Sequence, residues 1–114
     1  MLFISMEDFE AKARALAPIS RQEEIDCARR MQNGDAAARE RLIEGYLPLL
    51  ARYMRRMPVQ SIGLVCYRLQ ALEKAVDSFN FLQDSEPFTH RLNWALRQAS
   101  TRYTAEHRNP PDGK

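Results

Sequence analysis

The sequence predicts an all-α fold, in which residues 1–108 form one compact bundle of four to five helices. Apolar residues recur every three or four positions along most of the chain, which is the spacing of amphipathic helices. No segment shows the strict alternation of apolar and polar residues that marks a half-buried strand. The 114 residues include only four glycines, which disfavours the many tight turns of a β fold.

Capping residues mark the start of the first three predicted helices. Ser5 precedes the first helix, and Ser20 opens an S-x-x-E capping box before the second. An Asn-Gly pair is typical of a helix end, and Asp35 directly after it is a good N-cap for the third helix. That helix contains Pro48, which removes one backbone hydrogen bond and is expected to bend it. The predicted helices cover residues 6–16, 21–32 and 36–57.

The second half of the chain predicts two longer helices. Ser61 begins the clearest amphipathic run, residues 61–79. A polar turn follows, and Pro87 stands near the first turn of the last helix, residues 88–108. Residues 109–114 (NPPDGK) are expected to be a disordered tail. The apolar stripe of the 61–79 helix consists of Ile62, Val65, Leu69, Leu72, Val76 and Phe79.

Charge is distributed unevenly along the chain, although the net charge is only +2. Residues 88–114 hold five basic and two acidic residues. A locally basic segment fits a polyanionic partner. It fits a solubilising surface equally well, so charge alone does not decide between the two.

The two cysteines predict neither a disulfide nor a metal site. Cys27 and Cys66 lie far apart without CxxC spacing, and the two histidines do not complete a metal-ligand pattern. Both cysteines fall within or beside apolar stripes, so we expect buried free thiols in a reducing cytoplasm. We expect no metal and no other cofactor.

Several classes of protein are excluded by the same sequence. The first ten residues lack the basic region of a signal peptide, and no apolar run approaches membrane-spanning length. Carboxylates are interleaved with arginines, as solvated ion pairs on helix surfaces are, and no nucleophile or acid–base cluster stands out. We therefore expect no enzymatic activity, no small-molecule substrate and no membrane partner.

The last predicted helix carries an unusual polar face opposite its apolar stripe. Residues at helical spacing on this face include the only Trp of the chain. Arg neutralises phosphate, Gln can pair with a base edge, and Trp can stack on an unpaired base. Taken alone, Trp94 fits a core packing residue at least as well as a ligand-binding residue. The face consists of Arg91, Trp94, Gln98, Thr101 and Arg102.

Three blocks of the sequence match motifs of one protein family, in the same order and with the same separations. Residues 21–56 are similar to the family's acidic helix, GD turn and A-R-E-R-L-I-E motif. LVCYRLQALEKAVDSFN (64–80) aligns without gaps with L-I-Q-E-G-x-I-G-L-x-x-A-V-x-x-F-D. FTHRLNWALRQASTR (88–102) is similar to F-S-T-Y-A-x-W-W-I-R-Q-A-I-x-R. Together the blocks resemble the second conserved region of bacterial RNA polymerase sigma factors of the housekeeping-related family. The resemblance implies a helical fold like that of sigma region 2.

The resemblance also implies that the last helix contacts promoter DNA at the upstream edge of the melted −10 element. By position, Trp94 matches the first of the family's two wedging Trp residues. Gln98 and Thr101 match its base-reading residues, and two arginines match phosphate-facing positions. A Gln side chain can form two hydrogen bonds with adenine in the major groove. The predicted DNA-binding residues are Arg91, Trp94, Arg97, Gln98, Thr101 and Arg102.

A protein partner is implied as well, namely the coiled coil of the largest subunit of the RNA polymerase core. We expect it to dock on exposed side chains of the 61–79 helix. The region that recognises the −35 element has no counterpart in these residues, so a second chain that supplies it, or an anti-sigma protein, is a further expected partner. The expected location is the cytoplasm, in association with the nucleoid. The predicted partner-binding residues are Tyr67, Arg68, Gln70 and Lys74.

Departures from the family pattern leave two hypotheses open. Ala95 stands at the family's second Trp, and Arg91 at the Tyr before the pair, two aromatic positions that hold flipped bases. Cys66-Tyr67-Arg68 replaces the Q-E-G that docks on the polymerase. The leading hypothesis is a transcription-initiation module that binds the polymerase core and −10 DNA. The alternative is a protein-interaction module of the same fold, which binds a polymerase subunit or an anti-sigma protein without melting DNA.

Overall fold

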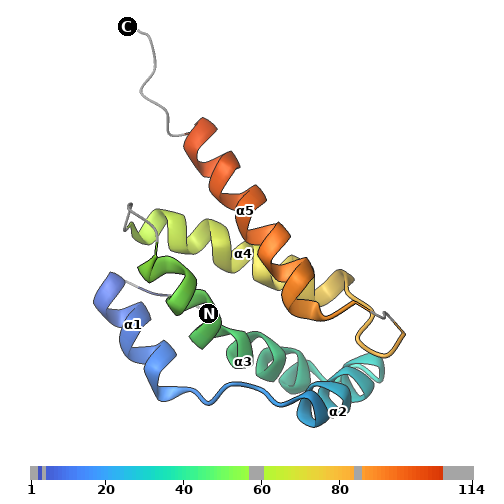
Figure 1. Ribbon diagram of the computed structural model, residues 1–114. Helices are drawn as coiled ribbons and strands as arrows, with labels where there is room; N and C mark the ends of the chain where they lie inside the picture. The colour runs from blue at the N-terminus through green and yellow to red at the C-terminus, as the bar shows by residue number, and fades with distance from the viewer. Residues whose placement is uncertain (1–2, 4, 57–60, 84–85, 107–114) are drawn as a thin grey trace, which may run out of the picture.

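The computed structural model describes residues 3, 5–56, 61–83 and 86–106, and within these ranges the chain forms five α-helices and no strand. The predicted all-α fold is thereby confirmed. In chain order the helices are α1 (Met6–Ala15), α2 (Arg21–Gln32), α3 (Ala36–Arg55), α4 (Ile62–Ser78) and α5 (Phe88–Glu106), as Figure 1 shows.

Four of the helices begin at the side-chain caps that the sequence predicts. Each capping serine oxygen accepts a hydrogen bond of 3.1 Å from the backbone N–H three residues further on. The Asp35 carboxylate accepts bonds of 3.0 and 3.2 Å from two N–H groups of α3. These bonds satisfy donors that have no partner within the helix, and each contributes about 1 kcal/mol. The caps are Ser5, Ser20, Asp35 and Ser61.

The helix ends lie within one or two residues of the predicted positions, and the larger shift is that of α3, which ends at Arg55 with Arg56 as its C-cap. Gly34 has a φ of 87°, which suits glycine and turns the chain from α2 into α3. α1 and α4 each end one residue before the predicted position. α3 continues as one helix through Pro48. The predicted helix ends at residues 57 and 108, and the predicted disordered tail 109–114, lie outside the described residues.

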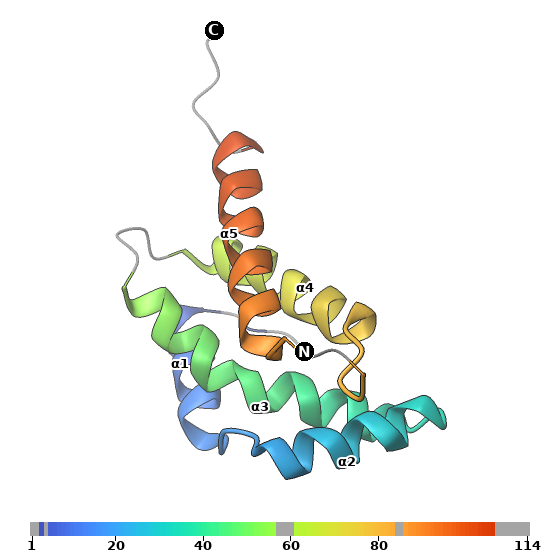
Figure 2. The same ribbon diagram turned by 45° about the vertical axis from the view of Figure 1, so that its right-hand side comes forward.

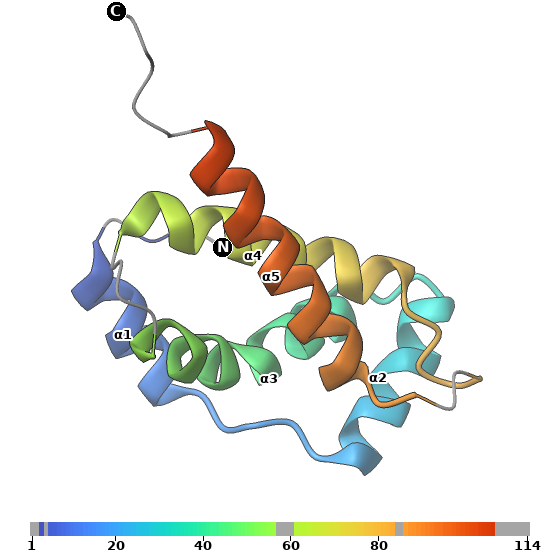
Figure 3. The ribbon, with the colours of Figure 1, turned by 45° about the horizontal axis from the view of Figure 1, so that its top comes forward.

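α3 is the central helix of the bundle. It packs against α1, α2 and α4, and α4 in turn packs against α5. In Figures 2 and 3, α5 crosses α4 obliquely and its last turns extend beyond it. The apolar stripes of α3, α4 and α5 meet in one core, as their spacing predicts. Completely buried members of this core include Leu42, Leu47, Val65, Leu72, Leu92 and Leu96.

Aromatic rings hold the first turn of α5 against the bundle. The centroid of the Phe88 ring lies 4.7 Å from that of Tyr46 in α3 and 5.2 Å from that of Phe79 at the end of α4. A third ring, Phe81 from the connection between α4 and α5, lies 4.9 Å away. All four rings are buried. Because such clusters combine area burial with favourable ring geometry, they fix the position from which α5 starts.

One carboxylate differs from the predicted pattern of solvated ion pairs. Glu24 of α2 is only 6% exposed. It accepts hydrogen bonds from the hydroxyl of Tyr46 and the guanidinium of Arg21. Burial and this hydrogen bond to Glu24 raise the pKa of Tyr46. The prediction of surface carboxylates is therefore wrong at Glu24, because two donors satisfy its buried oxygens.

The cysteines divide between core and surface. Cys27 is a buried free thiol, as predicted, whereas the free thiol of Cys66 is exposed, so that prediction is wrong. Cys66 directly follows Val65 of the apolar stripe, but successive helix residues are rotated by about 100°, which turns the thiol outward. Within the described residues, no helix is both long enough and apolar enough to cross a membrane.

Candidate nucleic-acid interface

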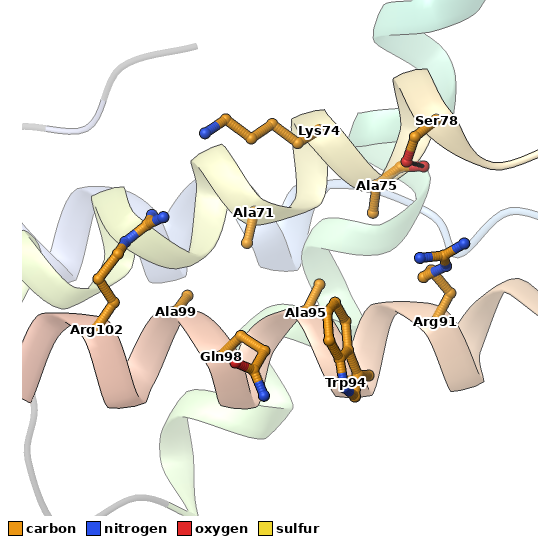
Figure 4. Close-up of a pocket in the computed structure, with 10 residues that line it drawn as sticks. All are labelled: Ala71, Lys74, Ala75, Ser78, Arg91, Trp94, Ala95, Gln98, Ala99 and Arg102. Atoms are coloured by element: carbon orange, nitrogen blue, oxygen red, sulfur yellow. Dashed lines mark hydrogen bonds between the residues drawn. The ribbon is translucent and has the colours of Figure 1, made fainter.

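A groove of about 290 Å³ runs between α4 and α5 on the surface of the bundle. Figure 4 shows Arg91 and Arg102 toward its two ends, with Trp94 and Gln98 between them on α5 and Lys74 on α4. We call it the α4–α5 groove. Its lining residues are Ala71, Lys74, Ala75, Ser78, Arg91, Trp94, Ala95, Gln98, Ala99 and Arg102.

Small side chains keep the α4–α5 groove open. Ala71 and Ala75 occupy successive turns of α4, and Ala95 and Ala99 do the same on α5. Residues four apart lie one above the other on a helix, so the two alanine pairs form a narrow apolar floor. Beside this floor Trp94 is 53% exposed, and it is the exposed large apolar residue of the described chain.

The charged side chains that line the α4–α5 groove are all basic. They are Lys74 from α4 and Arg91 and Arg102 from α5. The Nε atom of Arg102 also lies 4.0 Å from the carboxylate of Glu106, and its guanidinium lies 5.5 Å from the ring centre of Tyr67. An exposed ion pair of this kind contributes little, so a phosphate can replace it. The groove therefore combines cationic walls with an accessible aromatic plane.

Four of the six predicted DNA-binding residues line the α4–α5 groove, namely Arg91, Trp94, Gln98 and Arg102. The other two, Arg97 and Thr101, are exposed but lie outside the groove. Arg97 stands three residues after Trp94, and Thr101 stands three residues after Gln98. Three residues fall about 60° short of a full helical turn, so both side chains are rotated away from α4. The predicted face is thus broader than the groove, and it continues over the outer side of α5.

The predicted partner-binding residues do not form one exposed surface. Gln70 and Lys74 are exposed, as expected, and Lys74 belongs to the α4–α5 groove. Tyr67 is half-buried against the end of α5. Arg68 is only 1% exposed, so its prediction as an exposed contact is wrong. Its exposed position was expected because Cys66-Tyr67-Arg68 stands at the docking segment of the family that the sequence resembles.

Arg68 is buried because α3 and α5 supply its contacts. Its Nε and Nη2 atoms donate hydrogen bonds of 3.0 and 2.7 Å to the hydroxyl of Ser100 in α5. The remaining nitrogen donates to the sulfur of Met54, and the guanidinium lies 5.0 Å from the ring centre of Tyr53. Burial lowers the pKa of Arg68, and no carboxylate within the described residues offsets that effect.

The last turns of α5 are held to α4 by further polar contacts. The hydroxyl groups of Ser61 and Tyr103 are 3.0 Å apart. The hydroxyl of Tyr67 donates to the carboxylate of Glu106, and this hydrogen bond raises the pKa of Tyr67. The rings of Tyr67 and Tyr103 pack edge to face with centroids 5.1 Å apart. The orientation of this part of α5 thus depends on side chains from the first half of α4.

Two features of this region were not predicted from the sequence. One is the alanine floor of the groove, although a spacing of four residues on both helices was a usable signal. The other is Ser100, because nothing in its local sequence indicates that it accepts from a buried arginine. Among the described residues, no group of three or more His, Cys, Asp or Glu side chains is placed to hold a metal ion.

Comparison with known proteins relates the chain to a transcription factor of bacteria. No protein-family model matches the chain. The chain is similar to the RNA polymerase sigma factor SigA of Clostridium acetobutylicum, with 35% identity over 91 residues. The alignment covers 77% of this chain and 24% of the relative, so the chain spans about a quarter of the length of that protein. This similarity confirms the resemblance found in the sequence.

Proposed function

We propose that this chain, which carries a sigma-factor-like domain, acts in transcription initiation by binding promoter DNA of the −10 element and the RNA polymerase core. The observation that carries the DNA part is the α4–α5 groove. There an exposed tryptophan lies between side chains whose charges are all positive. Nucleic acid complements both features of the groove, since its phosphates pair with the basic side chains and a base can stack on the indole.

Each groove residue has a distinct role in this proposal. Arg91, Arg102 and Lys74 contact backbone phosphates and fix the register of the DNA without selecting a sequence. Trp94 stacks on a base at the junction of paired and unpaired strands, a contact that contributes about 1–3 kcal/mol. Gln98 contacts an adenine edge, which adds sequence preference.

The outer side of α5 extends the proposed contact beyond the groove. Arg97 and Thr101 are both exposed there. We assign Arg97 to a phosphate and Thr101 to a base edge of the duplex upstream of the junction. Because phosphate contacts set affinity and base contacts set preference, substitutions at these two positions affect different quantities.

The proposed polymerase contact uses the outward side of α4. Gln70 and Cys66 are one turn apart and both are exposed. Lys74 continues this row into the α4–α5 groove. Arg68 takes no part because it is buried. A separate chain that supplies −35 recognition, or an anti-sigma protein, remains a proposed further partner, with the cytoplasm and nucleoid as the proposed location.

The DNA part is tested with a fluorescent fork, a duplex that opens into a single-stranded −10 segment, and a fork whose segment is scrambled. We expect Trp94→Ala to weaken binding about tenfold, whereas Trp94→Phe keeps most of the affinity. Lys74→Ala is expected to lower the slope of log Kd against log salt by about one. Arg29→Ala, at an exposed position on α2, is the control for loss of a positive charge.

Two results contradict the DNA part of the proposal. One is an absence of fork binding by the wild-type chain at low salt. The other is equal binding by the wild type, Trp94→Ala and Gln98→Ala, because it reduces the interaction to general phosphate attraction.

The polymerase part is tested through the exposed thiol. Cys27 is buried, so a maleimide label attaches at Cys66 and projects from the outward side of α4. We expect the label to abolish capture of a bacterial core RNA polymerase without reducing fork binding. Unmodified Cys66→Ser is the control for loss of the thiol. Unchanged capture of the polymerase by the labelled chain contradicts this surface. Strong capture without any fork binding favours the alternative, a protein-interaction module that does not melt DNA.

A further inference from the structure

Arg68 occupies a place where a charge is unexpected. It is buried among α3, α4 and α5, and the described residues offer it no carboxylate. Transfer of a charge into the interior is costly unless partners replace water. An apolar side chain of similar length fills such a site at lower cost in free energy. Packing alone therefore does not account for an arginine at this position.

The contacts of Arg68 have a direction that packing does not require. Nε and Nη2 donate side by side to a single oxygen, the hydroxyl of Ser100. That hydroxyl in turn donates a bond of 2.9 Å to the backbone carbonyl of Leu96. The rotation of the Ser100 side chain is thereby fixed from both sides. The guanidinium plane is held against the ring of Tyr53 in α3.

Ser100 lies on the side of α5 that faces away from the α4–α5 groove. It is two residues from both Gln98 and Arg102, and such residues are about 200° apart around a helix. The apolar stripe of α5, with Leu96 and Ala99, lies between these two sides. A bond that fixes Ser100 relative to α4 consequently fixes the rotation of α5 about its own axis. That rotation decides how far Gln98 and Trp94 turn toward α4.

We propose that Arg68 is a positioning residue, which sets the rotation of α5 on α4 and thereby aligns Trp94 and Gln98 in the α4–α5 groove for base contact. This inference rests on the proposed function of the groove. It assigns Arg68 no contact with DNA. Discrimination between base sequences depends on the alignment of Trp94 and Gln98, whereas attraction to phosphate does not. Loss of the Arg68 guanidinium is therefore expected to impair discrimination more than it impairs phosphate attraction.

The test compares Arg68→Met with Arg29→Met in the full chain. Both variants lose one positive charge, but Arg29 is exposed on α2. For Arg68→Met we expect the urea midpoint to stay equal or rise, because an unpaired buried charge is removed. The ratio of Kd for the scrambled fork to Kd for the −10 fork is expected to fall about tenfold, toward one. The salt dependence of binding is expected to match that of Arg29→Met.

Ser100→Ala provides a second variant that keeps the arginine and removes its acceptor. We expect the same loss of discrimination, now with a lower urea midpoint, because the guanidinium loses its hydrogen bonds. Arg68→Lys is expected to lose discrimination as Arg68→Met does, since an ammonium group cannot donate two parallel hydrogen bonds from a planar group.

The possible failures are distinguishable. A folded Arg68→Met that discriminates as well as the wild type overturns the role of Arg68 and leaves the proposed function intact. If Arg68→Met loses stability and loses binding to the −10 fork and the scrambled fork to the same degree, the role of Arg68 is purely structural, and this result also overturns its role as a positioning residue. A wild-type chain without sequence preference contradicts the proposed function itself, and the inference falls with it.

Discussion

The two ends of α5 are held to the bundle by different sets of interactions. At the first turn, Phe88 packs among three other buried aromatic rings. At the last turns, the contacts are partly exposed and largely polar. The hydroxyls of Ser61 and Tyr103 are hydrogen-bonded to each other, and Tyr67 donates to Glu106. The rings of Tyr67 and Tyr103 also pack edge to face. The buried Arg68–Ser100 contact lies between the two ends.

This difference separates two tasks of the helix. Apolar contact area is not directional, so the aromatic cluster fixes where α5 begins but leaves its rotation weakly specified. Hydrogen bonds require particular angles and distances, so the polar contacts of the second half specify rotation at a modest gain in stability. The residues that we assign to DNA lie between these two regions and depend on both.

The largest effect is expected at the aromatic end. Phe88→Ala removes the ring shared by the whole cluster and leaves a cavity, so we expect a loss of about 3–5 kcal/mol in the free energy of unfolding. Urea denaturation followed by circular dichroism measures it. Phe88→Leu, which keeps most of the volume, is the control and is expected to lose much less. If Phe88→Ala loses less free energy of unfolding than Ser61→Ala does, the assignment of the larger stabilising role to the aromatic end is contradicted.

An intermediate effect is expected at the polar end. Ser61→Ala removes both the N-cap of α4 and the partner of Tyr103, so we expect a loss of about 1–2 kcal/mol. Ser5→Ala, which removes a cap of the same type from α1, is the control. The excess of the first loss over the second measures the contact with α5. Hydrogen exchange is expected to accelerate in the first turn of α4, which loses its cap, and in residues 101–106 of α5. Acceleration at Leu92 as well refutes a separate polar end.

The smallest effect is a dependence on pH that is confined to the polar end. The hydrogen bond to Glu106 raises the pKa of Tyr67 above its usual value of 10. The contribution of the Tyr67–Glu106 hydrogen bond to stability is therefore complete below pH 10, and it is lost as the pH rises through the higher pKa that Tyr67 has in the folded state. We expect hydrogen exchange in the last turns of α5 to show, in that pH range, a loss of protection in the wild type that is absent from Tyr67→Phe. At the aromatic end, burial raises the pKa of Tyr46, so that end is expected to persist. Simultaneous loosening of both ends contradicts this expectation.

Local chemistry made much of the fold predictable. Helix caps and apolar spacing act over three or four residues, so the five helices and their starts follow from the sequence. The exposure of Trp94 was predictable for the same reason, since it stands opposite the apolar stripe of its own helix.

The errors at Arg68 and Glu24 share one cause, which is dependence on residues distant in sequence. Arg68 is buried because Ser100 and Met54 from two other helices receive its hydrogen bonds. Glu24 is buried because Tyr46 of α3 donates to it. None of these three partners can be recognised from the residues that neighbour Arg68 or Glu24 in sequence.

The sequence by itself determined the helices, their apolar stripes and the polar face of α5, because each depends on backbone hydrogen bonding and on side-chain spacing within one segment. Only the tertiary structure decided that Lys74 joins Arg91 and Arg102 around an alanine floor, and that Arg68 lies inside. The crossing of α4 and α5 creates the groove and the buried site together, and a crossing is set by how two surfaces interlock rather than by either helix alone.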